Sequence, residues 1–207
     1  NEVGAMQPIA ECGKICKERG ITFHTDGVQP IGQLEIPVLP DMTTIAAHKF
    51  YGPKGIGALI VRDHVELCPQ ILGGGQEFNL RAGSENLPAI VGMAKALEIA
   101  LEKQPAEEKR LIALRDDFIA QLEALPGVTL NGPRTARLPN NANIRFEGKS
   151  GETIVIQLDL QGIAAATGSA CASGSSGPSH VLEAMGRTDK AASENIRFSL
   201  GASTTKE

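Results

Sequence analysis

The order of the apolar segments constrains the fold of this chain more than any other feature. Residues 6–19 have the apolar spacing of a helix, and Gly20 is a typical helix stop. Three short apolar runs of strand length follow at residues 21–26, 43–47 and 56–61. A helix followed by several strands is typical of an α/β layer with a mostly parallel sheet. We therefore expect functional residues beyond the carboxyl ends of these strands.

The second half of the chain has a different pattern. Residues 87–103 and 106–125 have the spacing of two helices, and we expect Pro105 to separate them because proline breaks helices. Short strand-like and helical segments alternate after them, which predicts a smaller α+β domain. We place the domain boundary within the long helices and expect one domain over residues 1–100 and a second over residues 101–207.

Composition excludes several classes of function. The 207 residues include 42% hydrophobic and 21% charged residues, which is ordinary for a globular protein. The net charge of -4 gives no electrostatic reason to expect nucleic acid or an anionic membrane as a partner. No apolar run approaches the ~18 residues that a spanning helix needs. With no secretion-signal pattern, we expect a cytoplasmic protein with free thiols.

Two of the four cysteines, Cys12 and Cys16, are four residues apart on the first predicted helix. Their spacing would suit two metal ligands, but no second pair of cysteines or histidines has metal-site spacing. We favour small apolar residues on a buried helix face and expect no metal site.

Asp26 and Lys49 each end an apolar segment and precede a turn. A lysine at such a place loses its charge readily when desolvated and becomes a nucleophile for a carbonyl group, although a surface lysine is the ordinary alternative. Asp26 favours the reactive lysine over the surface lysine, because a cofactor with a pyridinium nitrogen needs a carboxylate partner.

Cys171 lies in a run of glycine, serine, alanine and threonine at residues 167–174. No aliphatic neighbour is present to bury it, and such a loop suits a reactive thiol that must move. A tightly packed turn, in which cysteine is a slightly larger serine, explains the same residues equally well.

With these residues in place, the chain resembles the cysteine desulfurases of the NifS/IscS type, in the aminotransferase class V group of pyridoxal-phosphate (PLP) enzymes. The matching motifs lie at residues 1–4, 24–29, 48–59, 73–92, 168–173 and 196–201. None of them is decisive, but their order and spacing are specific. The resemblance implies the large-domain portion of the PLP-dependent transferase fold (aspartate aminotransferase-like, fold type I) and a smaller α+β domain. It also implies a fragment that lacks the N-terminal part and the extreme C-terminus.

The resemblance further implies which residues surround the cofactor. Lys49 would hold PLP as a Schiff base and would later remove the α-proton of the substrate. Asp26 would pair with the pyridine nitrogen. Gln29 and Asn1 would lie at the phenolic oxygen, and His48 would contact the phosphate.

Other matches imply a substrate and partners. Arg197, with Asn1, would bind the α-carboxylate of L-cysteine, since a guanidinium binds a carboxylate through two hydrogen bonds. Ser84 would reach the phosphate of the other subunit's cofactor, which implies a homodimer. Cys171 would attack the substrate sulfur and become a persulfide, a reversible carrier state, and would release alanine.

Lys49, His48 and Cys171 are therefore the predicted catalytic residues. One position departs from the family pattern, because Ala46 stands where a serine usually donates to the phosphate. The resemblance also implies that the N-terminal part, which supplies further contacts to the cofactor, is missing. For both reasons we expect the isolated chain to be weakly active or inactive.

The implied function is a cysteine desulfurase that passes sulfur to an acceptor such as an iron–sulfur scaffold protein. A selenocysteine lyase or a cysteine/cystine C–S lyase on the same fold is an alternative, which would use Lys49, Asp26 and Arg197 but would not need Cys171. An alternative of another class is a non-catalytic sulfur-relay or scaffold-binding homologue.

Overall fold

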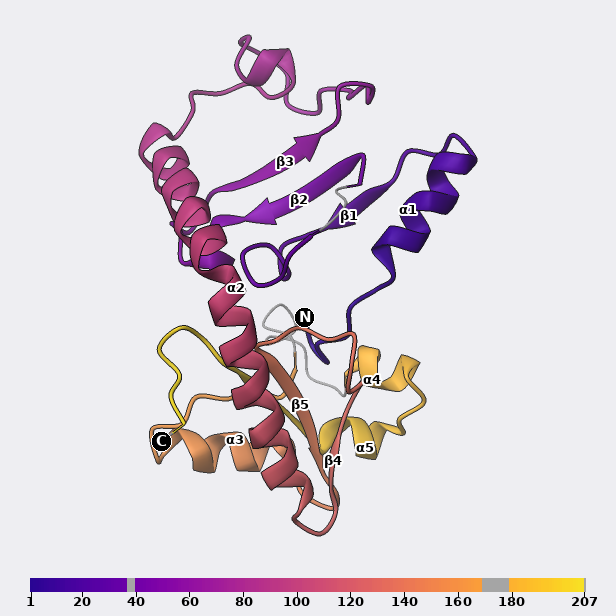
Figure 1. Cartoon of the computed structure of the whole chain (residues 1–207), viewed down its shortest axis with the longest axis vertical. Coiled ribbons are helices and arrows are strands. Elements are labelled where there is room, and N and C mark those ends of the chain that lie inside the picture. Colours follow the sequence, from indigo (N-terminus) through magenta and orange to yellow (C-terminus); the bar gives the residue numbers. More distant parts are fainter. Residues whose placement is uncertain (37–39, 169–178, 207) are drawn as a thin grey trace. The chain divides into compact units, whose positions relative to one another are not determined.

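The computed structural model describes residues 1–36, 40–168 and 179–206. These residues form two compact units, one of Pro8–Pro105 and one that joins Asn1–Gln7 to Ala106–Glu207. Their helices and strands, in chain order, are α1 (Ile9–Glu18), β1 (His24–Asp26), β2 (Met42–Ala46), η1 (Ala47–Phe50), β3 (Gly57–Val61), η2 (Glu77–Asn79), α2 (Leu87–Glu123), β4 (Val128–Leu130), β5 (Asn141–Phe146), α3 (Gly151–Asp159), α4 (His180–Ala184), α5 (Asp189–Ser193) and β6 (Asn195–Ser199), of which η1 and η2 are short 3-10 helices (Figure 1).

The unit Pro8–Pro105 contains a sheet in the order β1-β2-β3 (Figure 1). β1 and β2 are parallel, whereas β2 and β3 are antiparallel. The sheet is therefore mixed, and the expectation of a mostly parallel sheet was wrong for the described strands. The connection between β2 and β3 explains the difference, because residues 47–56 are too few for the crossover that a parallel pair requires. Ile45, Ala47 and Phe50 pack with Met93 of α2 in the core of this unit.

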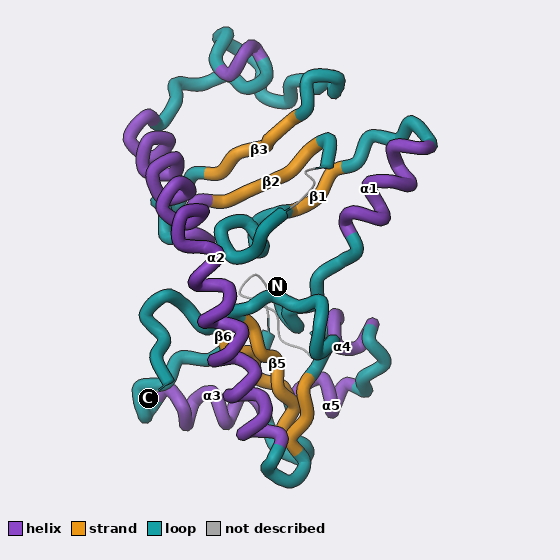
Figure 2. The backbone as a smooth tube through the Cα atoms, viewed as in Figure 1, coloured by secondary structure: helices purple, strands orange, loops and turns teal. Residues whose placement is uncertain are grey.

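The unit that includes Ala106–Glu207 contains a second sheet, in the order β4-β5-β6, in which both pairs are antiparallel (Figure 2). Its core joins Ile119 of α2 to Ala142 and Ile144 of β5. The ring of Phe198 on β6 meets that of Phe118 edge to face, with centroids 5.0 Å apart. This mixture of an antiparallel sheet and helices is the α+β arrangement that the second half of the sequence predicts.

Helix α2 continues through Pro105, where the sequence predicted a break. An internal proline costs about 3 kcal/mol in a helix. Burial on both sides of the proline outweighs this cost, since Met93 before it and Leu111 after it are each at least 93% buried. Among the described residues, no helix combines the length and the apolar character needed to cross a membrane.

The first seven residues pack with the second unit, whereas we expected them in a domain of residues 1–100. The reason is a set of buried polar side chains that bind their backbone. Asn141 Nδ2 donates to the carbonyl of Asn1 at 2.9 Å, and Asn143 Nδ2 donates to that of Glu2 at 3.2 Å. Arg137 Nη2 donates to the carbonyl of Val3 at 3.1 Å. Burial, followed by the charge of a neighbouring arginine, lowers the pKa of Arg137 to about 10.

A buried ion pair ties β5 to the segment before β6. Glu194 is 3% exposed and accepts from Arg145 Nε at 2.9 Å and from the Gly148 amide at 3.0 Å. The Arg145 hydrogen bond, with a smaller contribution from Gly148, holds the pKa of Glu194 below its ordinary value. The ionised Glu194 stabilises the folded protein because its pKa is lower there than in the unfolded chain. This stabilisation is fully present above the pKa of an unfolded glutamate, ~4.3, and is lost as the pH falls toward the lower pKa of the folded state.

We therefore expect Glu194→Gln to lower the free energy of unfolding at neutral pH by about 3 kcal/mol, because it leaves Arg145 without its buried charged partner. The variant should also lose part of the acid sensitivity of the wild type below ~4.3. Glu147→Gln is the matched control, since Glu147 lies 3.6 Å from Arg145 but is 67% exposed. Urea unfolding at neutral and acidic pH measures both effects. Equal stability of the two variants would contradict the account.

Candidate active site

Asp26 is the last residue of β1. Its Oδ1 accepts from the backbone amide of Val28 at 2.8 Å, which fixes the carboxyl group at the strand end. The next amide, that of Gly27, donates to the carbonyl of Thr44 at 2.9 Å and keeps β1 paired with β2 to its end. Gln29 follows in the turn and is half-buried, whereas Asp26 is exposed.

His48 and Lys49 come directly after β2, in the short helix η1. Ala47 and Phe50, the first and last residues of η1, are at least 98% buried. The two residues between them lie nearer the surface, with His48 exposed and Lys49 half-buried. Tyr51 then adopts a left-handed conformation with φ of 67°, which turns the chain toward β3.

The parallel pairing of β1 and β2 places these residues at one edge of the sheet. Asp26 pairs in register with Thr44, so the carboxyl ends of both strands lie together. The Asp26 carboxyl and the His48-Lys49 pair therefore leave the sheet at the same edge, as expected for a site in an α/β sheet.

The sequence motif gave no role to His24, yet its side chain joins the two strands next to Asp26. His24 Nε2 and Thr44 Oγ1 are 2.7 Å apart. His24 and Asp26 lie on the same face of β1 because side chains alternate along a strand. The alternation of residues 21–26 was the signal that could have assigned His24 to this face.

Ser84 is an exposed residue of the loop between β3 and α2. Hydrogen bonds shape this loop, including that of the Gly83 amide with Gln76 Oε1 at 3.1 Å. The loop also carries exposed apolar side chains, with Leu72 81% and Phe78 92% exposed.

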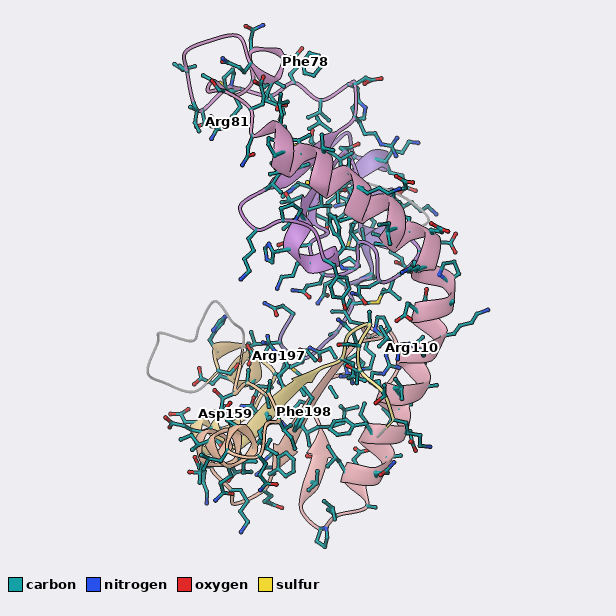
Figure 3. All side chains as sticks on the ribbon, turned by 90° about the vertical axis from the view of Figure 1, so that its left-hand side faces the viewer. Phe78, Arg81, Arg110, Asp159, Arg197 and Phe198 are labelled. Carbon is teal, nitrogen blue, oxygen red and sulfur yellow. The ribbon has the colours of Figure 1, made fainter. Side chains whose placement is uncertain are left out.

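Asn1 and Arg197 belong to the other unit and contact each other. Arg197 Nη1 donates to Asn1 Oδ1 at 3.0 Å. Arg197 lies on β6 next to Phe198 (Figure 3), and its backbone forms a two-way bridge with Ala166, with N–O distances of 2.6 and 3.1 Å. Cys171 lies outside the described residues, between Gly168 and Ser179 in the chain.

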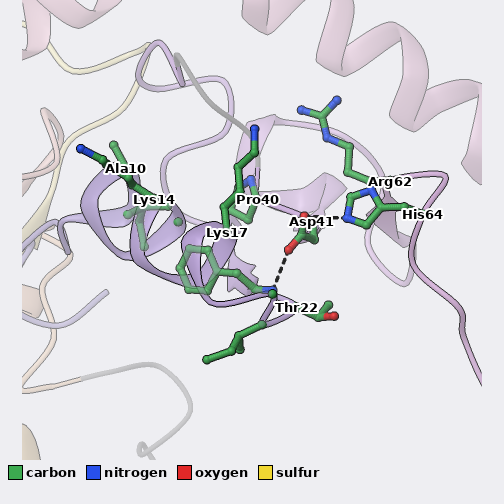
Figure 4. A pocket seen from close by; sticks show the side chains of 13 residues that line it. Ala10, Lys14, Lys17, Thr22, Pro40, Asp41, Arg62 and His64 are labelled. Carbon is green, nitrogen blue, oxygen red and sulfur yellow. Dashed lines mark hydrogen bonds and ion pairs between the residues drawn. The ribbon is translucent and has the colours of Figure 1, made fainter.

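A cavity of 620 Å³ in the unit Pro8–Pro105 has none of the predicted site residues in its lining (Figure 4). Its lining includes Phe23 before β1, Asp41 before β2 and Arg62 after β3. It is therefore at the amino ends of the parallel strands, opposite Asp26. Asp41 accepts from the Phe23 amide at 2.8 Å and lies 3.0 Å from His64 Nε2, and the amide bond is the main reason that its pKa is below the ordinary value.

Cys12 and Cys16 are half-buried on α1, and none of the residues of α1 is fully buried. The expected buried helix face was therefore wrong, since this helix packs on the unit only partly. Within residues 1–36, 40–168 and 179–206, no three histidine, cysteine or acidic side chains are grouped as metal ligands would be.

Curated relatives match the chain along its whole length. It is 49% identical over 213 residues to the cysteine desulfurase IscS of Clostridium botulinum and 50% identical over 211 residues to that of Dictyoglomus turgidum. Both matches cover 100% of this chain and 54% of the relative. The chain thus spans about half the length of the curated relatives it matches.

Solved structures of NifS-like proteins have the same fold as this chain. A NifS-like protein matches with a TM-score of 0.88 at 35% identity, over 99% of this chain and 54% of the other. A NifS-like protein from Rickettsia africae matches with a TM-score of 0.89 at 33% identity, over 99% and 55%. The predicted PLP-dependent transferase fold and the resemblance to the NifS/IscS type are confirmed. The family model for aminotransferase class-V matches residues 1–207, and the chain belongs to this family.

Proposed function

We propose that the protein containing these residues is a PLP-dependent cysteine desulfurase. One observation carries the proposal, namely the position of Asp26 and the His48-Lys49 pair at the carboxyl ends of two adjacent parallel strands. The identity of about half of all residues to curated cysteine desulfurases supports it.

The residues at this sheet edge fit PLP, which the family uses. Lys49 supplies an amine for the aldehyde of PLP, and Asp26 supplies an acidic group, already fixed by Val28, for the pyridine nitrogen. Gln29 and Asn1 would bind the phenolic oxygen and His48 the phosphate. When bound, PLP supplies an electron-withdrawing ring that takes up charge from the α-carbon of the substrate.

Residues of the chain itself have separate roles in the reaction. Lys49 Nζ accepts the α-proton of the substrate, a role that suits a half-buried amine. Asp26 keeps a proton on the pyridine nitrogen. Arg197 and Asn1, which are already hydrogen-bonded to each other, bind the α-carboxylate of L-cysteine.

The distinctive step belongs to Cys171. Its thiolate attacks the sulfur of the substrate, a Cys171 S–S bond forms, and the substrate Cβ–S bond breaks. The electron pair of the broken bond returns to the substrate, which takes up protons and leaves as alanine. Cys171 retains the sulfur as a persulfide, so the step balances without another oxidant. The persulfide would pass its sulfur to an acceptor such as an iron–sulfur scaffold protein in the cytoplasm.

The proposal includes a homodimer in which Ser84 reaches the phosphate of the second copy's cofactor. The exposed side chains of Leu72 and Phe78 support it, because apolar groups on one loop are typical of a surface that a partner covers. The unit Pro8–Pro105 would form the cofactor-bearing part of each copy, and the α+β unit would carry Cys171.

Product analysis tests the proposed reaction. The full-length protein should convert L-cysteine and a reductant to alanine and sulfide. Pyruvate and ammonia in place of alanine would identify a C–S lyase. A strong preference for selenocysteine would identify a selenocysteine lyase, and no turnover of either substrate would favour a non-catalytic homologue.

A further inference from the structure

One face of the sheet β4-β5-β6 is polar although it is buried. Ala142 and Ile144 of β5 pack with Ile119 of α2. Because side chains alternate along a strand, Asn141 and Asn143 lie on the opposite face of β5, where both are at least 96% buried. Buried amides are costly unless they are hydrogen-bonded. The partners of these two side chains therefore show what this face of the sheet holds.

Three polar side chains form a row across this face. Asn143 pairs in register with Arg197 of β6, so their side chains lie on the same face of the sheet. On the other side of Asn143 is Asn131, which follows β4 and whose backbone amide donates to the Asn143 carbonyl at 2.8 Å. Asn131 Nδ2 also donates to Asn143 Oδ1 at 2.8 Å. The row therefore ends at Arg197, which we assign to the substrate carboxylate.

The hydrogen bonds of the two asparagines in this row run in one direction. Arg187 Nη2 donates to Asn131 Oδ1 at 3.1 Å, and a guanidinium can only donate. Asn143 Nδ2 donates to the Glu2 carbonyl at 3.2 Å, and a carbonyl can only accept. Each amide therefore has a single orientation in which all of these bonds form. We call Arg187, Asn131 and Asn143 the amide relay.

The amide relay ends at the backbone that carries Asn1. Asn141 Nδ2 holds the same backbone, because it donates to the Asn1 carbonyl at 2.9 Å. Gly4 allows this close approach, since its φ is 77° and a Cβ on it would lie 2.7 Å from Asn141 Oδ1. From this position, Asn1 Oδ1 accepts from Arg197 Nη1 at 3.0 Å. Loss of the bonds to the backbone would therefore displace Asn1 relative to Arg197.

We propose that Asn131 and Asn143 are positioning residues, which hold Asn1 against Arg197 and thereby complete the site for the substrate carboxylate. The inference rests on the proposed function, since it requires that Asn1 and Arg197 bind L-cysteine. The amide relay would act on substrate binding rather than on the chemical step, because other residues carry the proposed bond changes. A loss of binding that is equal in the ground state and the transition state raises KM and leaves kcat unchanged.

The test measures alanine formation from L-cysteine by the full-length protein and its variants. Asn131→Asp keeps the shape of the side chain but replaces the donor Nδ2 by an oxygen, which would face Asn143 Oδ1. It should raise KM for L-cysteine at least ~tenfold and leave kcat and the absorbance of bound PLP within ~twofold of the wild type. When Asn1→Ala is already present, Asn131→Asp should raise KM no further, because both substitutions act through the same contact. A general loss of structure would raise KM in both cases.

Asn140→Asp is the matched control, since it makes the same exchange of atoms and adds the same charge in the same unit. Asn140 is half-buried, and its side chain takes part in none of the hydrogen bonds of the amide relay. KM of this variant should stay within ~twofold of the wild type. If Asn131→Asp fails to fold, Arg187→Met decides the question. It removes the donor that orients Asn131 and should raise KM ~threefold, and a wild-type KM would reject the inference.

These measurements separate failure of the positioning role from failure of the proposed function. If the wild type forms no alanine from L-cysteine, the proposed function is wrong, and the role of the amide relay in binding the carboxylate is wrong with it. If the wild type forms alanine and Asn131→Asp has the wild-type KM, only the positioning role is wrong. The positioning role is also wrong if Asn131→Asp raises KM as much in the Asn1→Ala protein as in the wild type.

Discussion

Replacing Lys49 by alanine is expected to lower the rate of alanine formation by at least ~1,000-fold. Lys49 has two proposed tasks, binding the aldehyde of PLP and carrying the α-proton, and no other amine follows directly after β2. Absorbance spectra should show loss of covalently held PLP, and borohydride should no longer fix the cofactor to the peptide that contains residue 49.

Lys54→Ala supplies the control for this experiment. Lys54 is an exposed residue of the same connection between β2 and β3, five positions later. Its loss should leave the absorbance and the rate within ~twofold of the wild type. A Lys49→Ala protein that still forms alanine at the wild-type rate would refute the assignment of Lys49.

Replacing Cys171 by serine should remove persulfide formation and lower sulfide release from cysteine by at least ~1,000-fold. The cause is loss of the thiolate that accepts the sulfur, since a serine hydroxyl is a far weaker nucleophile for it. Binding of PLP should be unaffected, because Lys49 and Asp26 remain. The variant thus separates the cofactor assignment from the sulfur-transfer assignment.

Cys68→Ser is the matched control, since Cys68 is an exposed free thiol in the described structure. It should retain the wild-type rate. Full cysteine turnover by Cys171→Ser would show that the reaction does not pass through the persulfide, and would support a C–S lyase.

The sequence predicted the local elements around the candidate site well. The apolar runs near Asp26 and before His48 correspond to β1 and β2, because short apolar runs bounded by polar residues and glycines have few other stable structures. The parallel pairing of these two strands brings their carboxyl ends together. The edge of the sheet that carries the candidate site could therefore be predicted from the order of the elements.

Features that depend on tertiary packing could not be predicted in this way. The break expected at Pro105 does not occur, because buried residues on both sides of it hold α2 together. β3 runs antiparallel to β2 because the connection between them is short. The length of this connection could be read from the sequence, but the prediction of a mostly parallel sheet did not take it into account. The contact between Glu2 and Ser179 joins residues 177 positions apart, so no local pattern could indicate it.

Mass spectrometry of the full-length protein after brief mixing with L-cysteine tests the central claim most directly. The proposed function predicts one additional sulfur atom on the peptide that contains Cys171, removed by a thiol reductant, and no addition on the peptides that contain Cys12, Cys16 or Cys68. An unmodified Cys171 while cysteine is consumed, or a sulfur atom found only on another cysteine, would contradict it.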